Sequence, residues 1–194
     1  MKIGVDVDDV LAVLSPALID NHNKIHGTSY VMSDFLDFKL ENTWGQPLKE
    51  AVKEIDGFLE KIKFDLEPIN GSIEAINKLS VNNEIFIITS RAKEHHTFTV
   101  NWLKKYFPNK FAGIYLANNF FPNGNKIDKK DICELLLIDV LVEDYLHQAI
   151  ACAPVVKNVI LFNYPWNQSK NLPKNIIRVK NWKEAIDFVE KAKK

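Results

Sequence analysis

The chain has 194 residues, a length that fits one α/β domain carrying a modest insertion. The hydrophobic fraction is 46% and the formal net charge is zero, so the composition is that of a globular protein without a global attraction to nucleic acids or membranes. No stretch approaches the roughly 20 apolar residues of a membrane span. Cys133 and Cys152 have neither the spacing of a disulfide framework nor that of a metal site. With no charged leader before the first strand, a reducing, cytoplasmic location is expected.

Short apolar runs alternate with helical patterns along most of the chain. The runs are rich in Ile, Val and Leu without strict alternation, as expected of strands buried on both faces of a parallel sheet. The predicted strands are residues 3–7, 84–89, 113–117, 139–143 and 156–162, with a weaker one at 176–179. Helices are predicted over 97–107, 128–137 and after Asn181, which forms a capping box with Glu184. This alternation predicts an α/β, Rossmann-like three-layer sandwich with a central parallel sheet.

The alternation breaks once, between the first two strands. Ser15-Pro16 is expected to open a helix with the serine as its cap, and Gly27 to close it. Further helical stretches cover about 47–62 and 71–82. Because a βαβ crossover needs a single helix, residues 14–68 are interpreted as a small helical cap inserted after the first strand. Residues 1–13 and 69–194 then form the core, and the cap is expected to cover the strand ends and exclude water.

The first predicted strand runs directly into carboxylates at Asp6, Asp8 and Asp9. Their closeness is repulsive unless a cation lies nearby, and a hard divalent ion such as Mg²⁺ takes oxygen ligands. The strand end therefore predicts a metal-assisted site at the edge of the sheet where open α/β folds bind ligands. A turn with capping aspartates is the alternative.

Two later strand ends carry complementary groups. Thr89, Ser90 and Arg91 offer hydroxyl, amide and guanidinium donors suited to a phosphate, although a helix cap is an equally ordinary use of the hydroxyls. Glu143 and Asp144 form a second acidic strand end, so one metal between it and Asp6 would relieve both repulsions.

Three lysines, Lys126, Lys129 and Lys130, lie near the start of the helix before the Glu143 strand. Lysine is disfavoured at a helix start by the helix dipole, so one of the three is expected to point into the site. Solvent-exposed lysines are the expectation for the other two.

In this order the four motifs resemble the haloacid dehalogenase-like hydrolases: Asp6-Val7-Asp8, Thr89, a lysine, then Glu143-Asp144. The likeness extends from residue 2 to about residue 162. The residues of several short segments are similar to those of the 5′-nucleotidase, deoxy-type branch, which contains the 5′(3′)-deoxyribonucleotidases. The residues that carry this narrower likeness are Asp6–Leu11, His26-Gly27 to Trp44-Gly45, Pro165-Trp166-Asn167 and Ile177-Arg178-Val179.

The resemblance implies a role for each catalytic position. Asp6 would be the nucleophile and Asp8 the general acid and base. Mg²⁺ would bind the Asp6 and Asp144 carboxylates and the Asp8 backbone carbonyl. Thr89 and Lys129 would hold phosphoryl oxygens, with Lys129 preferred to Lys126 and Lys130 from its fourteen-residue spacing to Glu143.

The neighbouring positions receive supporting roles by the same resemblance. Glu143 would orient a metal-bound water. Asp9 stands where many members have glycine, and its backbone N–H is expected to face the phosphate. Ser90 and Arg91 complete the substrate-binding set, with Arg91 binding either the phosphate or a carboxylate of the cap.

The insertion contains two further groups of interest. His22 and His26 are four residues apart, a spacing that can bind metal, but no third ligand is evident in the sequence, so packing or solvent exposure is expected. Phe35, Phe38 and Trp44 are expected to form the core of the cap, with a stacking wall for a nucleobase as the alternative.

The sequence thus predicts a Mg²⁺-dependent phosphomonoesterase that forms an aspartyl-phosphate. From the resemblance alone, its substrates are expected to be nucleoside or deoxynucleoside monophosphates. The alternatives are a phosphatase for another small phosphomonoester, such as a sugar phosphate, and a non-catalytic Mg²⁺- or nucleotide-binding module. A small-molecule substrate is the expected partner, with no nucleic acid polymer and no membrane; the oligomeric state is left open.

Overall fold

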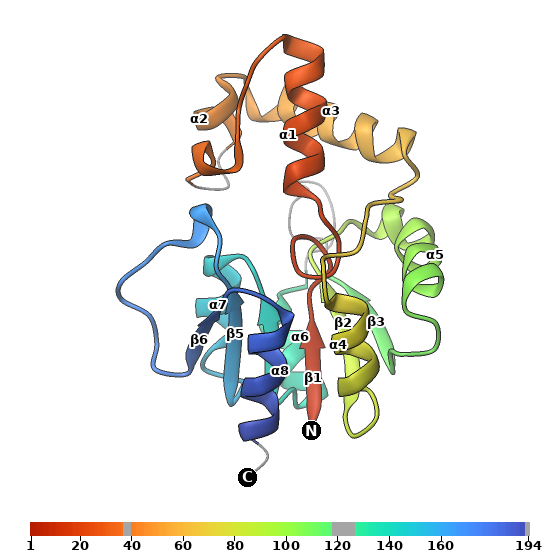
Figure 1. Ribbon diagram of the computed structural model, residues 1–194, viewed down its shortest axis with the longest axis vertical. Helices are drawn as coiled ribbons and strands as arrows, with labels where there is room; N and C mark the ends of the chain where they lie inside the picture. Colours follow the sequence, from red (N-terminus) through yellow and green to blue (C-terminus); the bar gives the residue numbers. More distant parts are fainter. Residues whose placement is uncertain (37–39, 118–126, 193–194) are drawn as a thin grey trace.

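The computed structural model describes residues 1–36, 40–117 and 127–192 of the chain. Its centre is a parallel sheet of six strands in the order β3-β2-β1-β4-β5-β6 (Figure 1). The strands are β1 (Lys2–Val5), β2 (Glu84–Thr89), β3 (Gly113–Leu116), β4 (Val140–Glu143), β5 (Asn158–Phe162) and β6 (Ile176–Val179). The predicted strands are therefore all present, with boundaries that shift by at most two residues.

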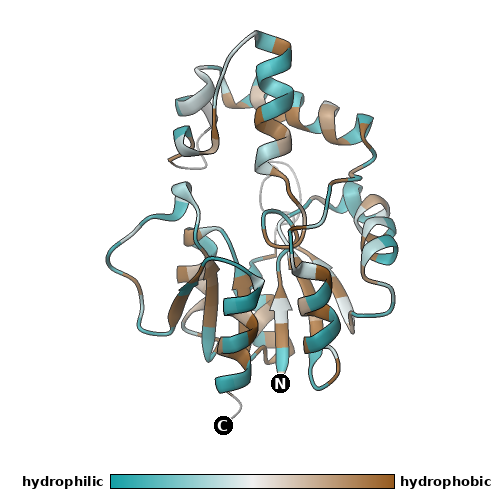
Figure 2. Cartoon of the chain, in the orientation of Figure 1, coloured by the Kyte–Doolittle hydropathy of each residue, from teal (hydrophilic) through white to brown (hydrophobic). Residues whose placement is uncertain are grey.

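Helices cover both faces of the sheet. The helices are α4 (Ser72–Leu79), α5 (His96–Tyr106), α6 (Lys129–Leu136), α7 (Leu146–Cys152) and α8 (Trp182–Lys191). One hydrophobic cluster joins the sheet to α4, α5 and α8, and a second joins it to α6 and α7. Figure 2 shows the apolar residues concentrated on the strands between these helical layers. This arrangement confirms the predicted α/β three-layer sandwich.

The middle strand β1 is packed tightly on both sides. Gly4 lies opposite Phe86 of β2 and Leu141 of β4. A Cβ atom at Gly4 would lie 2.9 Å from Cδ1 of Ile88, which is closer than carbon atoms approach. Glycine at this position therefore leaves room for the side chain of Ile88 on β2.

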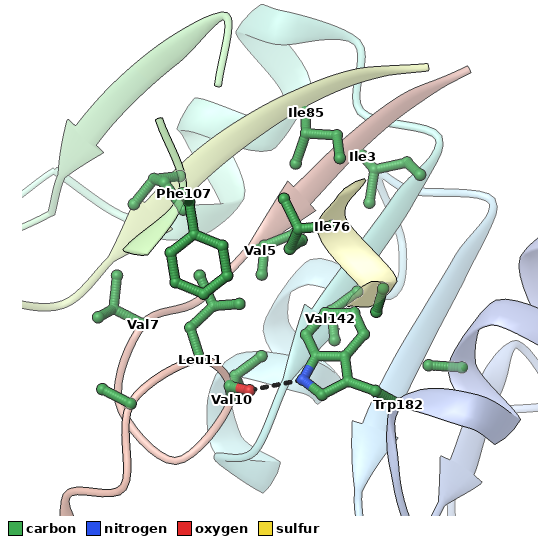
Figure 3. Packing of buried hydrophobic residues seen from close by; sticks show 14 of the residues in the cluster. Ile3, Val5, Val7, Val10, Leu11, Ile76, Ile85, Phe107, Val142 and Trp182 are labelled. Atoms are coloured by element: carbon green, nitrogen blue, oxygen red, sulfur yellow. Dashed lines mark hydrogen bonds between the residues drawn. The ribbon is translucent and has the colours of Figure 1, made fainter. Parts of the chain in front are cut away.

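Trp182 joins the last helix to the loop that follows β1. Its ring is buried in the cluster drawn in Figure 3, and its Nε1 donates a hydrogen bond of 2.9 Å to the carbonyl of Val10. A buried indole N–H needs such a partner. The contact fixes the loop that carries the acidic residues after β1 against the core.

A small helical cap follows β1 and lies beyond the carboxyl ends of the strands (Figure 1). It consists of α1 (Ser15–His26), the 3-10 turn η1 (Met32–Asp34), α2 (Leu40–Trp44) and α3 (Leu48–Lys61). Its buried apolar cluster contains Ile19, Phe35, Trp44 and Ala51, and is joined by Trp166 from the core. Among the described residues, no helix combines the length and apolar character that crossing a bilayer requires.

Two capping predictions are confirmed and one is wrong. Gly27 ends α1 in the left-handed region, with φ of 66°. Asn181 caps α8 by accepting a hydrogen bond of 3.0 Å from the Glu184 N–H. The Glu184 carboxylate accepts from the Lys180 N–H at 2.8 Å instead of the Asn181 N–H, so only this half of the predicted capping box forms. Ser15, expected to cap α1, is instead its first residue, and the carboxylate of Asp9 accepts hydrogen bonds from its N–H and hydroxyl. The Asp9 carboxylate, six residues before Ser15, thus takes the place of a capping side chain at the start of α1.

Candidate active site

The predicted site residues follow three neighbouring strands. β1 pairs with β2 on one side and with β4 on the other, so the carboxyl ends of all three meet at one edge. Asp6 comes one residue after β1, although the predicted strand extended to residue 7, and its N–H donates a hydrogen bond of 3.0 Å to the carbonyl of Val142. Glu143 ends β4 and Asp144 follows it. The topology therefore brings two acidic segments together.

Lys129, the first residue of α6, lies between these carboxylates. Its Nζ is 3.1 Å from Oδ2 of Asp6 and 3.0 Å from Oε2 of Glu143. The lysine is fully buried, whereas Lys130 is exposed and Lys126 lies outside the described residues. Of the two described lysines, Lys129 is therefore the one that reaches Asp6. The pairing of Glu143 with Lys129 was not anticipated, since Glu143 was expected to orient a metal-bound water.

Burial dominates the electrostatics of this cluster. It raises the pKa of Asp6, Glu143 and Asp144, and the neighbouring carboxylates raise each pKa further. The Lys129 ammonium opposes that rise. Burial alone would lower the pKa of Lys129, but the carboxylates of Asp6 and Glu143 outweigh it and raise the pKa. A site with three buried carboxylates and one ammonium is short of positive charge.

The donor set fits a hard divalent cation. One carboxylate oxygen from each of Asp6, Glu143 and Asp144 lies within 4.8 Å of the other two. Oδ1 of Asp6 is buried and makes no hydrogen bond with the described residues. An unpaired buried carboxylate oxygen is costly without a cation or a donor. Oxygen ligands of this kind suit Mg²⁺, although the geometry does not single out that ion.

Asp144 is held by residues whose role the sequence did not reveal. Trp166 Nε1 donates 3.1 Å to its Oδ2, and Asn167 Nδ2 donates 2.6 Å to its backbone carbonyl. Both residues belong to the 3-10 turn η3 (Pro165–Asn167), and Arg178 Nη1 donates 2.6 Å to Asn167 Oδ1. These contacts orient Asp144 toward Asp6. The sequence signals were the Pro-Trp-Asn and Ile-Arg-Val segments, which were used for the family likeness and not for the site.

Arg91 grips Asp8 through both of its carboxylate oxygens. Arg91 Nη2 is 2.7 Å from Oδ1, and Nε donates 3.0 Å to Oδ2. Nη1 donates 3.1 Å to the Thr99 hydroxyl, and the guanidinium lies 5.2 Å from the Phe64 ring centre. Of the two alternatives for Arg91, the ion pair with a cap carboxylate is wrong, because the carboxylate partner belongs to the core. Binding of the substrate phosphate by Arg91 stays a prediction.

The hydroxyl residues at the end of β2, Thr89 and Ser90, are buried. Thr89 is completely buried, and its Oγ1 accepts a hydrogen bond of 3.3 Å from the Arg91 N–H. Ser90 is 6% exposed. Thr89 thus shapes the turn that presents Arg91 but does not cap a helix, since neither the 3-10 turn η2 (Lys93–His95) nor α5 begins with a side-chain cap. Its hydroxyl hydrogen can donate to another acceptor.

Asp9 differs from the expectation for a phosphate contact. Its N–H donates 2.8 Å to the carbonyl of Ala12, and so does not face an open site. Its side chain accepts from the N–H groups of Leu14 and Ser15 at 3.2 Å and 2.9 Å. Burial raises the pKa of Asp9 to about 7, against the effect of the Ser15 hydrogen bonds. Its φ of 53° is one that aspartate tolerates better than most residues.

The described aromatic residues of the cap serve its core. Phe35 and Trp44 are buried and pack edge to face with ring centres 6.0 Å apart. Phe38 lies outside the described residues. At these two positions the cap-core interpretation is favoured over a nucleobase wall.

Solved structures of other proteins share this fold. A haloacid dehalogenase-like hydrolase of Streptococcus pneumoniae superposes with a TM-score of 0.69, at 15% identity, over 97% of each chain. A haloacid dehalogenase-like protein of Agrobacterium tumefaciens superposes with a TM-score of 0.66, at 17% identity, over 100% of this chain and 99% of that one. The fold is that of the haloacid dehalogenase-like hydrolases.

The sequence comparison narrows this class. The profile of the family described as 5′ nucleotidase, deoxy (Pyrimidine), cytosolic type C protein matches residues 1–194, and the chain belongs to that family. A nucleotidase of Clostridium acetobutylicum is 26% identical over 98% of this chain and 94% of its own. The protein is therefore a hydrolase of phosphomonoesters, as the family resemblance implied.

Proposed function

We propose that the protein is a Mg²⁺-dependent nucleotidase that acts through an aspartyl-phosphate on Asp6. The observation that carries the proposal is the pairing of Asp6 with Lys129. One carboxylate oxygen is held 3.1 Å from the Lys129 ammonium, and the other is buried without a hydrogen-bond partner among the described residues. An oriented carboxylate with one free oxygen is suited to attack phosphorus.

The metal would be held by the carboxylates of Asp6 and Asp144 and by the backbone carbonyl of Asp8. When bound, Mg²⁺ supplies positive charge that lets the carboxylate and the anionic phosphoryl group approach each other. Trp166 and Asn167 support this role by fixing Asp144 before any ion arrives.

In the first step, Asp6 Oδ1 forms a bond to phosphorus while the bond from phosphorus to the ester oxygen breaks. Asp8, which takes up a proton from solvent once it has turned away from Arg91, gives that proton to the leaving alkoxide. Asp8 must turn from Arg91 for this step, since both its oxygens accept hydrogen bonds from the guanidinium. The Lys129 ammonium and the Thr89 hydroxyl stabilise the charge that spreads over the phosphoryl oxygens.

In the second step, Asp8 accepts a proton from water as the water oxygen bonds to phosphorus. The bond between phosphorus and Asp6 breaks, so inorganic phosphate leaves and the Asp6 carboxylate is regenerated. The two half-reactions return every residue to its starting state, which makes the cycle catalytic.

Nucleoside and deoxynucleoside monophosphates are the proposed substrates. Support comes from the family match and from the relative named a nucleotidase. We place the cap at residues 14–68, because the segments that enter and leave it run side by side. The Val13 N–H donates 2.9 Å to the carbonyl of Glu67, and the Ile69 N–H donates 2.7 Å to the carbonyl of Leu11. A cap that is connected to the core through two adjacent linking segments is suited to opening for substrate and closing over it.

The variant Asp6→Asn tests the nucleophile. The amide is nearly isosteric but a poor nucleophile, so phosphate release from p-nitrophenyl phosphate should fall by at least about a thousandfold. After acid quenching, mass spectrometry should find phosphate on the Asp6 peptide of the wild type and none in the variant.

The matched control is Asp139→Asn, which alters a carboxylate at the opposite end of the sheet, bonded to the Lys2 N–H at 2.9 Å. This variant should keep its activity. Phosphate release by a folded Asp6→Asn protein at the wild-type rate would remove Asp6 from the role of nucleophile.

A further inference from the structure

A second group of potential metal ligands lies in the cap, away from the carboxylates of the active site. His22 and His26 are one turn apart on α1, so their rings share a face, and α3 places Glu54 opposite them. His22 Nδ1 is 2.9 Å from Oε1 of Glu54, and His26 Nε2 is 2.9 Å from Oε2. Ligand atoms from all three residues lie within 4.8 Å of one another. The third ligand that the sequence did not reveal is therefore present.

The three side chains are held in place by their surroundings. The His22 ring is 3% exposed and stacks on Trp44, with ring centres 4.3 Å apart and planes 7° from parallel. Glu54 also accepts a hydrogen bond of 3.2 Å from Gln46 Nε2. His26 is 39% exposed, so solvent can reach the group from one side. An ion would meet three oriented donors and a side open to water, which is the form of a four-coordinate site with one exchangeable ligand.

The chemistry of the donors selects the class of ion. Two imidazole nitrogens and one carboxylate oxygen suit Zn²⁺ and its neighbours among the divalent transition metals, whereas Mg²⁺ prefers oxygen ligands alone. The proposed catalytic cluster of Asp6, Glu143 and Asp144 offers only oxygen. The two groups should therefore discriminate between the two kinds of ion.

We propose that His22, His26 and Glu54 form a transition-metal site, of the Zn²⁺ type, that clamps α1 to α3. In the metal-free arrangement the nitrogen atoms that face Glu54 carry hydrogens. On metal binding these two nitrogens give up their hydrogens and become ligands together with one carboxylate oxygen, and each neutral ring then carries its single hydrogen on its other nitrogen. The clamp joins two helices through histidines that lie 28 and 32 residues before Glu54 along the chain, and so stabilises the cap independently of catalysis.

Equilibrium dialysis against Zn²⁺ in excess Mg²⁺ tests the proposal, because Mg²⁺ competes for the all-oxygen cluster. The wild type should bind one Zn²⁺ per chain. His26→Gln and Glu54→Gln keep groups that can hydrogen-bond but lose a metal ligand, so each should weaken Zn²⁺ binding by at least about tenfold. His147→Ala, which removes an exposed imidazole on α7, should bind Zn²⁺ like the wild type.

Thermal unfolding gives a second readout that does not depend on turnover. Zn²⁺ should raise the melting temperature of the wild type and of His147→Ala, and raise that of His26→Gln much less at the same Zn²⁺ concentration. If the wild type binds no Zn²⁺ in excess Mg²⁺, or if His26→Gln and Glu54→Gln bind it as tightly as the wild type does, the three residues form only a hydrogen-bonded link and the proposal is overturned.

Discussion

At the scale of single residues, the buried ammonium of Lys129 explains how three carboxylates can share the end of two strands. A fully buried lysine is stable only with counter-charges, and Asp6 and Glu143 supply them at 3.1 Å and 3.0 Å. The same contacts fix the rotamer of Asp6, the residue proposed to attack phosphorus. Electrostatic stability and orientation of the nucleophile thus depend on one side chain.

The pair of Arg91 and Asp8 is the clearest energetic coupling near the site. A double-mutant cycle with Arg91→Ala and Asp8→Ala, measured by urea unfolding in the presence of chelator, should give a coupling free energy of about 2 kcal/mol. The reason is the two-bond grip, in which Arg91 is 4% exposed and Asp8 25% exposed. If the losses in the free energy of unfolding of the two single variants simply add in the double variant, the interaction between Arg91 and Asp8 does not stabilise the folded state.

Only part of the site could be predicted from the sequence at the residue scale. Asp6, Asp8 and Asp144 stand out because carboxylates at the ends of apolar runs have no packing role. Asn167 and Glu54 do not stand out, because their partners lie 23 and 28 or more residues away along the chain. Their contacts arise from the way that turns and helices are packed, which local patterns do not encode.

At the scale of elements, the start of α1 depends on the loop after β1. The unpaired N–H groups of the first helical turn are satisfied by Asp9, not by a residue of the helix itself. This arrangement attaches the first helix of the cap directly to the loop that carries Asp6 and Asp8. Movement of the cap and the geometry of the acidic loop should therefore be linked.

The variant Asp9→Ala tests that attachment. It removes the acceptor for α1 and places alanine at φ of 53°, so the free energy of unfolding should fall by about 2 kcal/mol. Asp9→Asn, which keeps an acceptor and tolerates this backbone angle, should lose much less. Denaturant unfolding of the two variants measures the difference, and equal stability of Asp9→Ala and the wild type would contradict the account.

The elements themselves were more predictable than their ends. Strands buried on both faces leave a continuous apolar signal, and all six were expected near their observed positions. The start of α1 was misassigned because Ser15-Pro16 has the spelling of a local cap, while the burial of Asp9 let a residue six positions earlier supply the acceptor. The contact with Asp9, and not the local capping preference of Ser15, therefore determines where α1 begins.

At the scale of the whole molecule, the sheet supplies a rigid edge and the cap stands over it (Figure 1). Trp166 takes part in both, since it donates to Asp144 and packs in the apolar cluster with Ile19 and Trp44. One core side chain thus connects the proposed metal ligand to the interior of the cap. Movement of the cap is therefore expected to shift Trp166 and, through it, the Asp144 carboxylate.

The measurement that tests the central claim most directly is phosphate release from ribo- and deoxyribonucleoside monophosphates and from sugar phosphates, with Mg²⁺ and with chelator. The account predicts release from nucleoside monophosphates that chelator abolishes and added Mg²⁺ restores, with slower release from sugar phosphates. Release that survives chelator would contradict the metal site of Asp6 and Asp144. Release from sugar phosphates alone would contradict the proposed substrates, and no release from any of them would contradict the proposed function.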